Sequence, residues 1–146
     1  MDTIANTRPL NAPHVLLVDD VPDVLVTLGA FLRSAGYVVS TASNGDAALE
    51  LIKRKADIGV LVTDFAMPGI SGVELITLAE QFRPNLRALI ITGYPNADGL
   101  QCLSSRIALL IKPFRRATLV AGVNFLFGQM QFELPDAAME IASRAH

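Results

Sequence analysis

Five short apolar segments, each followed by residues typical of a helix start, constrain the fold of this chain more than any other feature. The segments are rich in Val, Ile and Leu without polar alternation, which is typical of strands covered on both faces of a parallel sheet. They lie at 14–18, 37–42, 58–62, 86–91 and 107–111. Helices are expected at about 22–35, 45–55, 71–82 and 115–129, with a short or irregular helix within 96–106. This alternation predicts an α/β protein with a doubly wound, five-stranded parallel sheet, right-handed crossovers and helices on both faces.

The turn after the first strand helps to choose between the two common strand orders. It reads Asp19-Asp20-Val21-Pro22 and contains no glycine that would admit a pyrophosphate, which disfavours a dinucleotide-binding Rossmann site. The flavodoxin-like order 2-1-3-4-5 is therefore predicted. In that order the first and third strands are neighbours, so Asp19 and Asp20 would meet Asp64 at the carboxyl edge of the sheet.

Composition narrows the class of protein. The chain is 51% hydrophobic, its net charge is −2 and it holds one cysteine, Cys102. No run of Lys and Arg indicates a nucleic-acid or membrane-surface partner, and no apolar run approaches the roughly 18 residues of a membrane span. His14 and His146 are too few and too far apart to indicate a metal cluster. We expect a soluble cytoplasmic protein with a loose leader over 1–13, one domain over 14–129 and a tail over 130–146 that could add a short helix.

The ends of four predicted strands carry the residues that matter for chemistry. They are Asp19 with Asp20, Asp64, Thr92 and Lys112. Three crowded carboxylates repel each other, and a hard divalent cation such as Mg²⁺, which prefers oxygen ligands, relieves that repulsion. Lys112 can pair with Asp64 or with phosphate oxygens, and the Thr92 hydroxyl can donate to an anion. A carboxylate beside Mg²⁺ and a lysine is a plausible phosphoryl acceptor.

Four segments, in order along the chain, resemble the signature segments of response-regulator receiver domains, which are CheY-like. They are Val18-Asp19-Asp20, the stretch from Thr63-Asp64-Phe65-Ala66-Met67-Pro68-Gly69 to Gly72, Ile91-Thr92-Gly93-Tyr94 and Ile111-Lys112-Pro113-Phe114. The separations between Asp20, Asp64, Thr92 and Lys112, of 44, 28 and 20 residues, also suit that family. The resemblance covers about 15–127, and it is nearest to the receivers of hybrid histidine kinases.

The resemblance implies a phosphorelay function for this chain. Asp64 would accept a phosphoryl group from a histidine kinase or a histidine phosphotransfer protein. Asp20 and Asp64 would bind Mg²⁺, Asp19 would help through water, and Ala66 would contribute its backbone carbonyl. Thr92 and Lys112 would contact the phosphoryl oxygens, and the peptide bond before Pro113 would be cis. Such a chain is a signalling receiver rather than an enzyme, apart from its own Mg²⁺-dependent phosphorylation and dephosphorylation.

One departure from the family concerns the switch. Receivers often carry Tyr or Phe three residues before the lysine, and here that residue is Leu109. We therefore expect phosphorylation to act through Thr92 and the segment 93–106 rather than through an aromatic side chain. Output would pass through a docked protein, a self-dimer or a larger parent protein. The sequence leaves open the cognate kinase and whether the chain is a stand-alone regulator or part of a hybrid kinase.

Two other function classes stay open at this point. An aspartyl phosphatase or dehalogenase also places an Asp after a strand with Mg²⁺ and Lys. It usually has a second acid two residues later, where this chain has Ala66, and a cap insertion for which this chain has no room. The other alternative is a receiver-like interaction module that docks partners without phosphorylation. Phosphate incorporation at Asp64 distinguishes that module from an active receiver.

Overall fold

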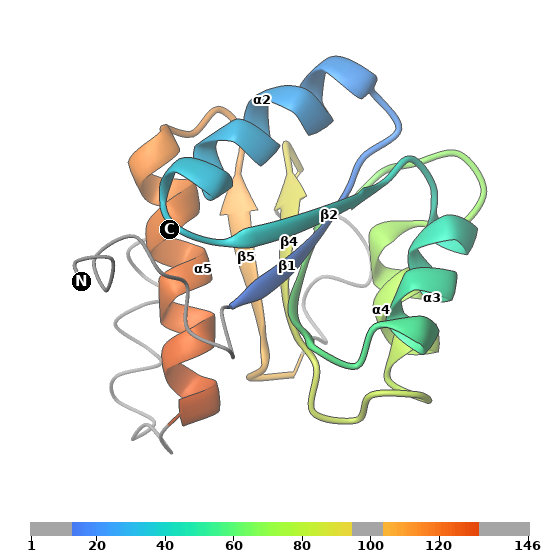
Figure 1. The fold of residues 1–146 in the computed structure, drawn as a ribbon. Helices are drawn as coiled ribbons and strands as arrows, with labels where there is room; N and C mark the ends of the chain where they lie inside the picture. The colour runs from blue at the N-terminus through green and yellow to red at the C-terminus, as the bar shows by residue number, and fades with distance from the viewer. Residues whose placement is uncertain (1–12, 95–103, 132–146) are drawn as a thin grey trace.

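A computed structural model of the chain describes residues 13–94 and 104–131, with a five-stranded parallel sheet at its centre (Figure 1). The strands are β1 (His14–Val18), β2 (Val38–Ala42), β3 (Ile58–Asp64), β4 (Arg87–Thr92) and β5 (Ile107–Ile111). Their order is β2-β1-β3-β4-β5. The predicted fold class and the 2-1-3-4-5 order are confirmed.

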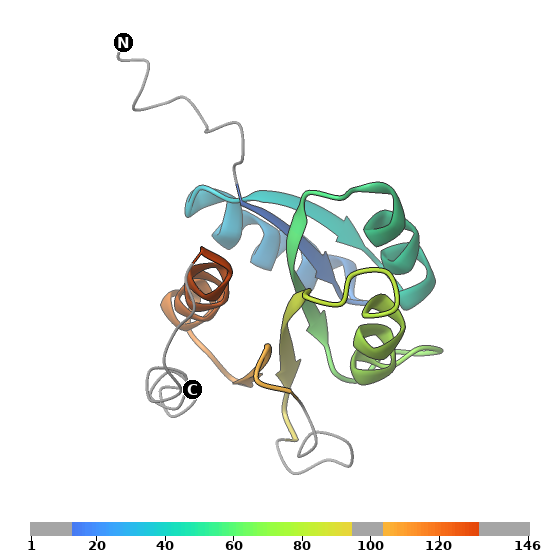
Figure 2. The ribbon, with the colours of Figure 1, turned by 90° about the horizontal axis from the view of Figure 1, so that it is seen from below.

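Helices cover both faces of this sheet (Figure 2). They are α2 (Pro22–Ser34), α3 (Gly45–Arg54), α4 (Gly72–Ala79) and α5 (Arg116–Gln131). α2 and α5 lie on one face, and α3 and α4 lie on the other (Figures 1 and 2). None of the helices in the described part of the chain is long and apolar enough to cross a membrane. Most of the irregular segment 96–106 lies outside the described residues, as does the predicted leader apart from residue 13. The predicted tail over 130–146 also lies outside them, except for residues 130 and 131, which belong to α5.

Local sequence explains where these helices begin. Pro22 occupies the first turn of α2, where its missing N–H costs nothing. The Asn44 side chain caps α3 by accepting a hydrogen bond from the N–H of Ala47. Ser71 and Glu74 form a reciprocal capping box at the start of α4.

The apolar core has two layers because every interior strand is buried on both faces. All five residues of β1 and all seven of β3 are buried. One layer joins the sheet to α2 and α5 around Leu17, Leu32 and Leu119. The other joins it to α3 and α4 around Leu16, Ile52 and Leu75. This double burial explains why the strands are continuous apolar runs in the sequence.

Two details differ from the sequence-based expectation. Strand β3 continues through Thr63 to Asp64, which pairs with Ile91 of β4, so the acid belongs to the strand rather than to the loop after it. The helix expected over 71–82 is shorter in the structure. Helix α4 ends at Ala79, and the Phe82 side chain is 48% exposed, with Lys53 Nζ 4.8 Å from its ring centroid.

Candidate functional site

The carboxyl edge of the sheet brings the predicted site residues together because hydrogen bonds between the strands continue to their ends. The N–H of Asp19 donates to the carbonyl of Ala42, and the N–H of Phe65 donates to the carbonyl of Ile91. The N–H of Lys112 donates to the carbonyl of Thr92 over 2.8 Å. These bonds hold the backbone beside each site residue on the rigid sheet.

Asp19, Asp20 and Asp64 form an acidic cluster at this edge. Each offers a carboxylate oxygen, and these oxygens lie within 4.8 Å of one another. Asp19 and Asp64 are buried, at 5% and 8% exposure, whereas Asp20 is exposed. Burial raises the pKa of Asp19, and the negative charges of Asp64 and Asp20 raise it further. The hydrogen bond that Asp19 accepts from the N–H of Val21 acts in the opposite direction and lowers this pKa. Such a set of oxygen donors, crowded and costly to ionise, fits a hard divalent cation such as Mg²⁺.

Lys112 supplies a positive charge beside Asp64. Its Nζ lies 3.0 Å from Asp64 Oδ1, and its side chain is half-exposed. The backbone enters the next helix through a cis Lys112–Pro113 peptide bond, as the resemblance predicts. An exposed lysine that already contacts the carboxylate can reach oxygens of a group bound there.

Thr92 lies at the end of β4 and is buried. Its Oγ1 accepts a hydrogen bond from the N–H of Tyr94 over 2.8 Å. Because a hydroxyl both accepts and donates, this contact leaves the Thr92 proton available for an anion at the site. Ala66 is exposed two residues beyond Asp64, and its role as a carbonyl ligand stays a prediction.

Gly72 is a positioning residue that the sequence-based reasoning missed. A Cβ at Gly72 would lie 2.4 Å from the carbonyl oxygen of Asp64 and 3.2 Å from the Cα of Phe65. Its own N–H donates to the Phe65 carbonyl. The first turn of α4 therefore packs directly on the backbone of Asp64 and Phe65. The Ser71–Glu74 capping pattern indicated the helix start but not this close approach.

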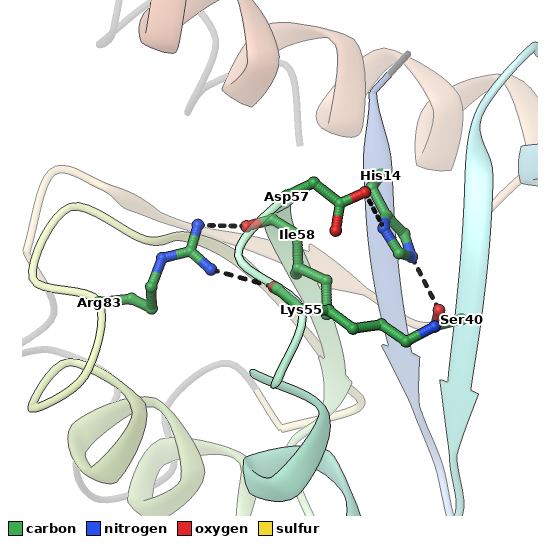
Figure 3. Close-up of polar contacts among 6 residues, drawn as sticks. All are labelled: His14, Ser40, Lys55, Asp57, Ile58 and Arg83. Atoms are coloured by element: carbon green, nitrogen blue, oxygen red, sulfur yellow. Dashed lines mark hydrogen bonds and ion pairs between the residues drawn. The ribbon is translucent and has the colours of Figure 1, made fainter. Parts of the chain in front are cut away.

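A second polar network, at the amino edge of the sheet, was also missed. His14 of β1 is buried, and its Nε2 lies 2.7 Å from the Ser40 hydroxyl oxygen. Its Nδ1 lies 3.0 Å from Asp57 Oδ2, and Figure 3 shows the three side chains in one row. The Arg83 guanidinium donates to the carbonyls of Lys55 and Ile58 beside this row (Figure 3). The network holds β1, β2 and the loop before β3 together.

Comparison with known families agrees with this arrangement. The family model of the response regulator receiver domain matches residues 15–124. The chain belongs to the response regulator receiver family. It is therefore a signalling domain of two-component systems. Receiver domains in general act as phosphoacceptors, and this general role applies to the chain.

Individual receivers show the same relationship. The transcriptional regulatory protein PrrA of Mycobacterium leprae is 34% identical over 122 residues, which cover 80% of this chain and 51% of that protein. A response regulator receiver protein from Sinorhizobium medicae has a structure that superposes with a TM-score of 0.75 at 29% identity, covering 82% of this chain and 98% of the other. The receiver domain of the hybrid histidine kinase CckA superposes with a TM-score of 0.67 at 28% identity, covering 77% of this chain and 97% of that domain. The chain spans about a fifth to a half of the length of the curated relatives it matches.

Proposed function

We propose that this receiver accepts a phosphoryl group on Asp64 in a Mg²⁺-dependent reaction and passes the signal on by a conformational change. The observation that carries the proposal is the contact of Asp64 with Lys112, 3.0 Å away, beside a carboxylate cluster whose oxygens lie within 4.8 Å. The donor would be a phosphohistidine of a histidine kinase or of a histidine phosphotransfer protein. The downstream partner would be a docked protein or a second copy of the chain.

In this proposal each residue of the site has a distinct role. Asp64 attacks phosphorus, Lys112 offsets the charge on the phosphoryl oxygens, and Thr92 donates its hydroxyl to one of them. Asp20 and Asp64 would hold Mg²⁺ directly, with the Ala66 carbonyl, and Asp19 would hold it through water. Bound there, Mg²⁺ would neutralise charge that develops during phosphoryl transfer. Positioning and charge neutralisation supply most of the catalysis that such a transfer needs.

The alternative, a module that docks without phosphorylation, is not favoured. Docking alone gives no reason to hold two carboxylates of the cluster nearly buried beside a lysine, because burying charged groups is costly. A phosphatase or dehalogenase is disfavoured because the position two residues after the acceptor is Ala66, which has no acid to protonate a leaving group.

Incubation with phosphoramidate, with and without Mg²⁺, tests the proposal. Intact-mass measurement should show one added phosphoryl group in the wild-type protein, only with Mg²⁺ and not in Asp64→Asn. Asp46→Asn is the matched control because Asp46 is an exposed acid at the start of α3 that does not belong to the acidic cluster. A phosphoryl group on Asp64→Asn, or one that does not depend on Mg²⁺, would refute the assignment.

A further inference from the structure

A mostly apolar cavity of about 380 Å³ opens beside the carboxyl edge of the sheet. It is the place where the core layer between the sheet, α2 and α5 reaches the surface, since Leu28 and Ile91 of its lining belong to that layer. The side chains that line its apolar part are Val24, Thr27, Leu28, Ile91 and Phe114.

The same cavity shares residues with the proposed phosphorylation site. Asp19 and Lys112 line both, and Ile91 pairs with Asp64 in the sheet register. A molecule whose anionic head contacts Lys112 therefore has an apolar surface next to it. The cavity favours an uncharged chain beyond that head, because its lining is mostly apolar and the Asp23 carboxylate in the lining would repel a second negative charge.

We propose that this cavity binds the alkyl chain of an acyl phosphate, so that Asp64 reacts preferentially with acyl phosphates that carry chains longer than acetyl. The inference rests on the proposed function and names a class of small phosphodonor for that site. The phosphoryl group of the acyl phosphate would lie at Lys112 and the acidic cluster, and its alkyl chain would lie among Val24, Leu28 and Phe114.

The reaction balances without a further reactant. A carboxylate oxygen of Asp64 attacks phosphorus, and a new O–P bond forms. The bond between phosphorus and the acyl oxygen breaks, and the acid leaves as its carboxylate with the electron pair. No proton transfer is required. Carboxylates of straight-chain acids are leaving groups of nearly equal basicity, so a change of rate with chain length reports binding of the chain rather than bond breaking.

The test compares acetyl, butyryl and hexanoyl phosphate as donors to the Mg²⁺-loaded wild-type protein, with phosphorylation of Asp64 followed by intact mass. Each methylene that becomes fully buried is worth about fourfold in binding. Butyryl phosphate, with two more methylenes than acetyl phosphate, should therefore react about 5- to 15-fold faster at low donor concentration. Equal second-order rate constants for the three donors would overturn the inference.

Matched variants of α2 locate the effect. Thr27→Phe adds an aromatic ring at the lining of the cavity, whereas Val26→Phe adds it at a neighbouring residue that is 70% exposed and outside the lining. Thr27→Phe should remove the advantage of butyryl phosphate and keep the reaction with acetyl phosphate, and Val26→Phe should keep both. Chain-length dependence that persists in Thr27→Phe would place the chain elsewhere and overturn the inference.

Two further measurements separate the possible failures. Hexanoate should slow the reaction with butyryl phosphate in the wild-type protein and acetate should not; this needs no variant. If neither phosphoramidate nor any acyl phosphate modifies Asp64, the proposed function fails, and this inference fails with it. If phosphoramidate modifies Asp64 and none of the acyl phosphates does, the proposed function stands and this inference is wrong. If chain length has no effect but Thr27→Phe slows transfer from a phosphorylated histidine kinase, the cavity serves a protein partner and the small-donor inference is wrong.

Discussion

Replacement of Gly72 by Ala should damage both the stability and the phosphorylation of this receiver. The added Cβ would lie 2.4 Å from the Asp64 carbonyl oxygen, and contacts below 3.0 Å essentially do not occur. The gap must open by about 0.6 Å at least, and the atoms that oppose it are backbone atoms of Asp64 and Phe65 rather than flexible side chains. Either α4 moves off the sheet, or the end of β3 moves with its carboxylate.

The size of the effect follows from opposing contributions. Overpacking of this kind costs about 1–3 kcal/mol, and the loss of glycine freedom in the unfolded chain returns about 0.4–1 kcal/mol. We expect a net loss of about 1–2 kcal/mol, which lowers Tm by about 3–10 °C in a domain of this size. Because a misplacement approaching 1 Å can cost about 100-fold in rate, Mg²⁺-dependent phosphorylation of Asp64 should slow by about 10- to 100-fold.

Gly128→Ala is the matched control. Gly128 lies inside α5, and a Cβ built there meets no other atom within 4 Å in the described part of the structure. Alanine in a helix interior is favoured over glycine by about 0.5–1 kcal/mol, so this variant should be slightly more stable and should phosphorylate normally. Thermal unfolding and the rate with phosphoramidate check both variants. If Gly72→Ala is as stable as the wild type, the contact between α4 and Asp64 does not constrain the site as argued.

Two further predictions follow from shifted pKa values. The raised pKa of Asp19 means that its ionisation destabilises the metal-free folded protein, and stability is lost as pH rises from about 3.9 through the folded pKa. Asp19→Asn should therefore raise the metal-free Tm at neutral pH and reduce the stabilisation that Mg²⁺ gives, and a Tm equal to that of the wild type with and without Mg²⁺ would contradict this. The hydrogen bond with His14 lowers the pKa of Asp57, so its contribution to stability is present above about pH 3.9 and is lost as pH falls through the folded pKa. Asp57→Asn should lower Tm at neutral pH and have a smaller effect in strong acid. Because Asp57 is largely exposed, the difference should be small, and an effect independent of pH would count against the hydrogen bond between His14 and the Asp57 carboxylate.

Local sequence was sufficient to predict the structure wherever a segment's own residues determine its conformation. The runs at Val15–Val18 and Ile58–Val62 are apolar because both faces of their strands are covered, so each strand appears in the sequence as an uninterrupted apolar segment. The glycine-free turn after β1 disfavoured a dinucleotide-binding site and so helped to choose the strand order. The site residues at the carboxyl edge could be predicted to lie together because the carboxyl ends of parallel strands lie at the same edge of a sheet.

Sequence was insufficient where a residue depends on distant neighbours. The partners of His14 are 26 and 43 residues away, and nothing near His14 in the sequence indicates them. Phe82 follows the apolar spacing of α4, but that helix ends at Ala79, so its ring lies outside the core and beside Lys53. Both cases depend on tertiary packing rather than on a local pattern.

The network at the amino edge has a consequence for the site at the opposite edge, because register is transmitted along a strand. His14 pairs with Ile58, whereas Val15 pairs with Val60, so Gly59 is an extra residue in β3 at this point. A slip of one residue would turn every later side chain of β3 to the other face. The bond from His14 to Asp57, directly before β3, fixes the strand at the point where the pairing changes. From Val60 onward the pairing is regular up to Val18 with Thr63, which places Asp64 level with Asp19. The position of the acidic cluster thus depends on a register that is set at the far end of the same two strands.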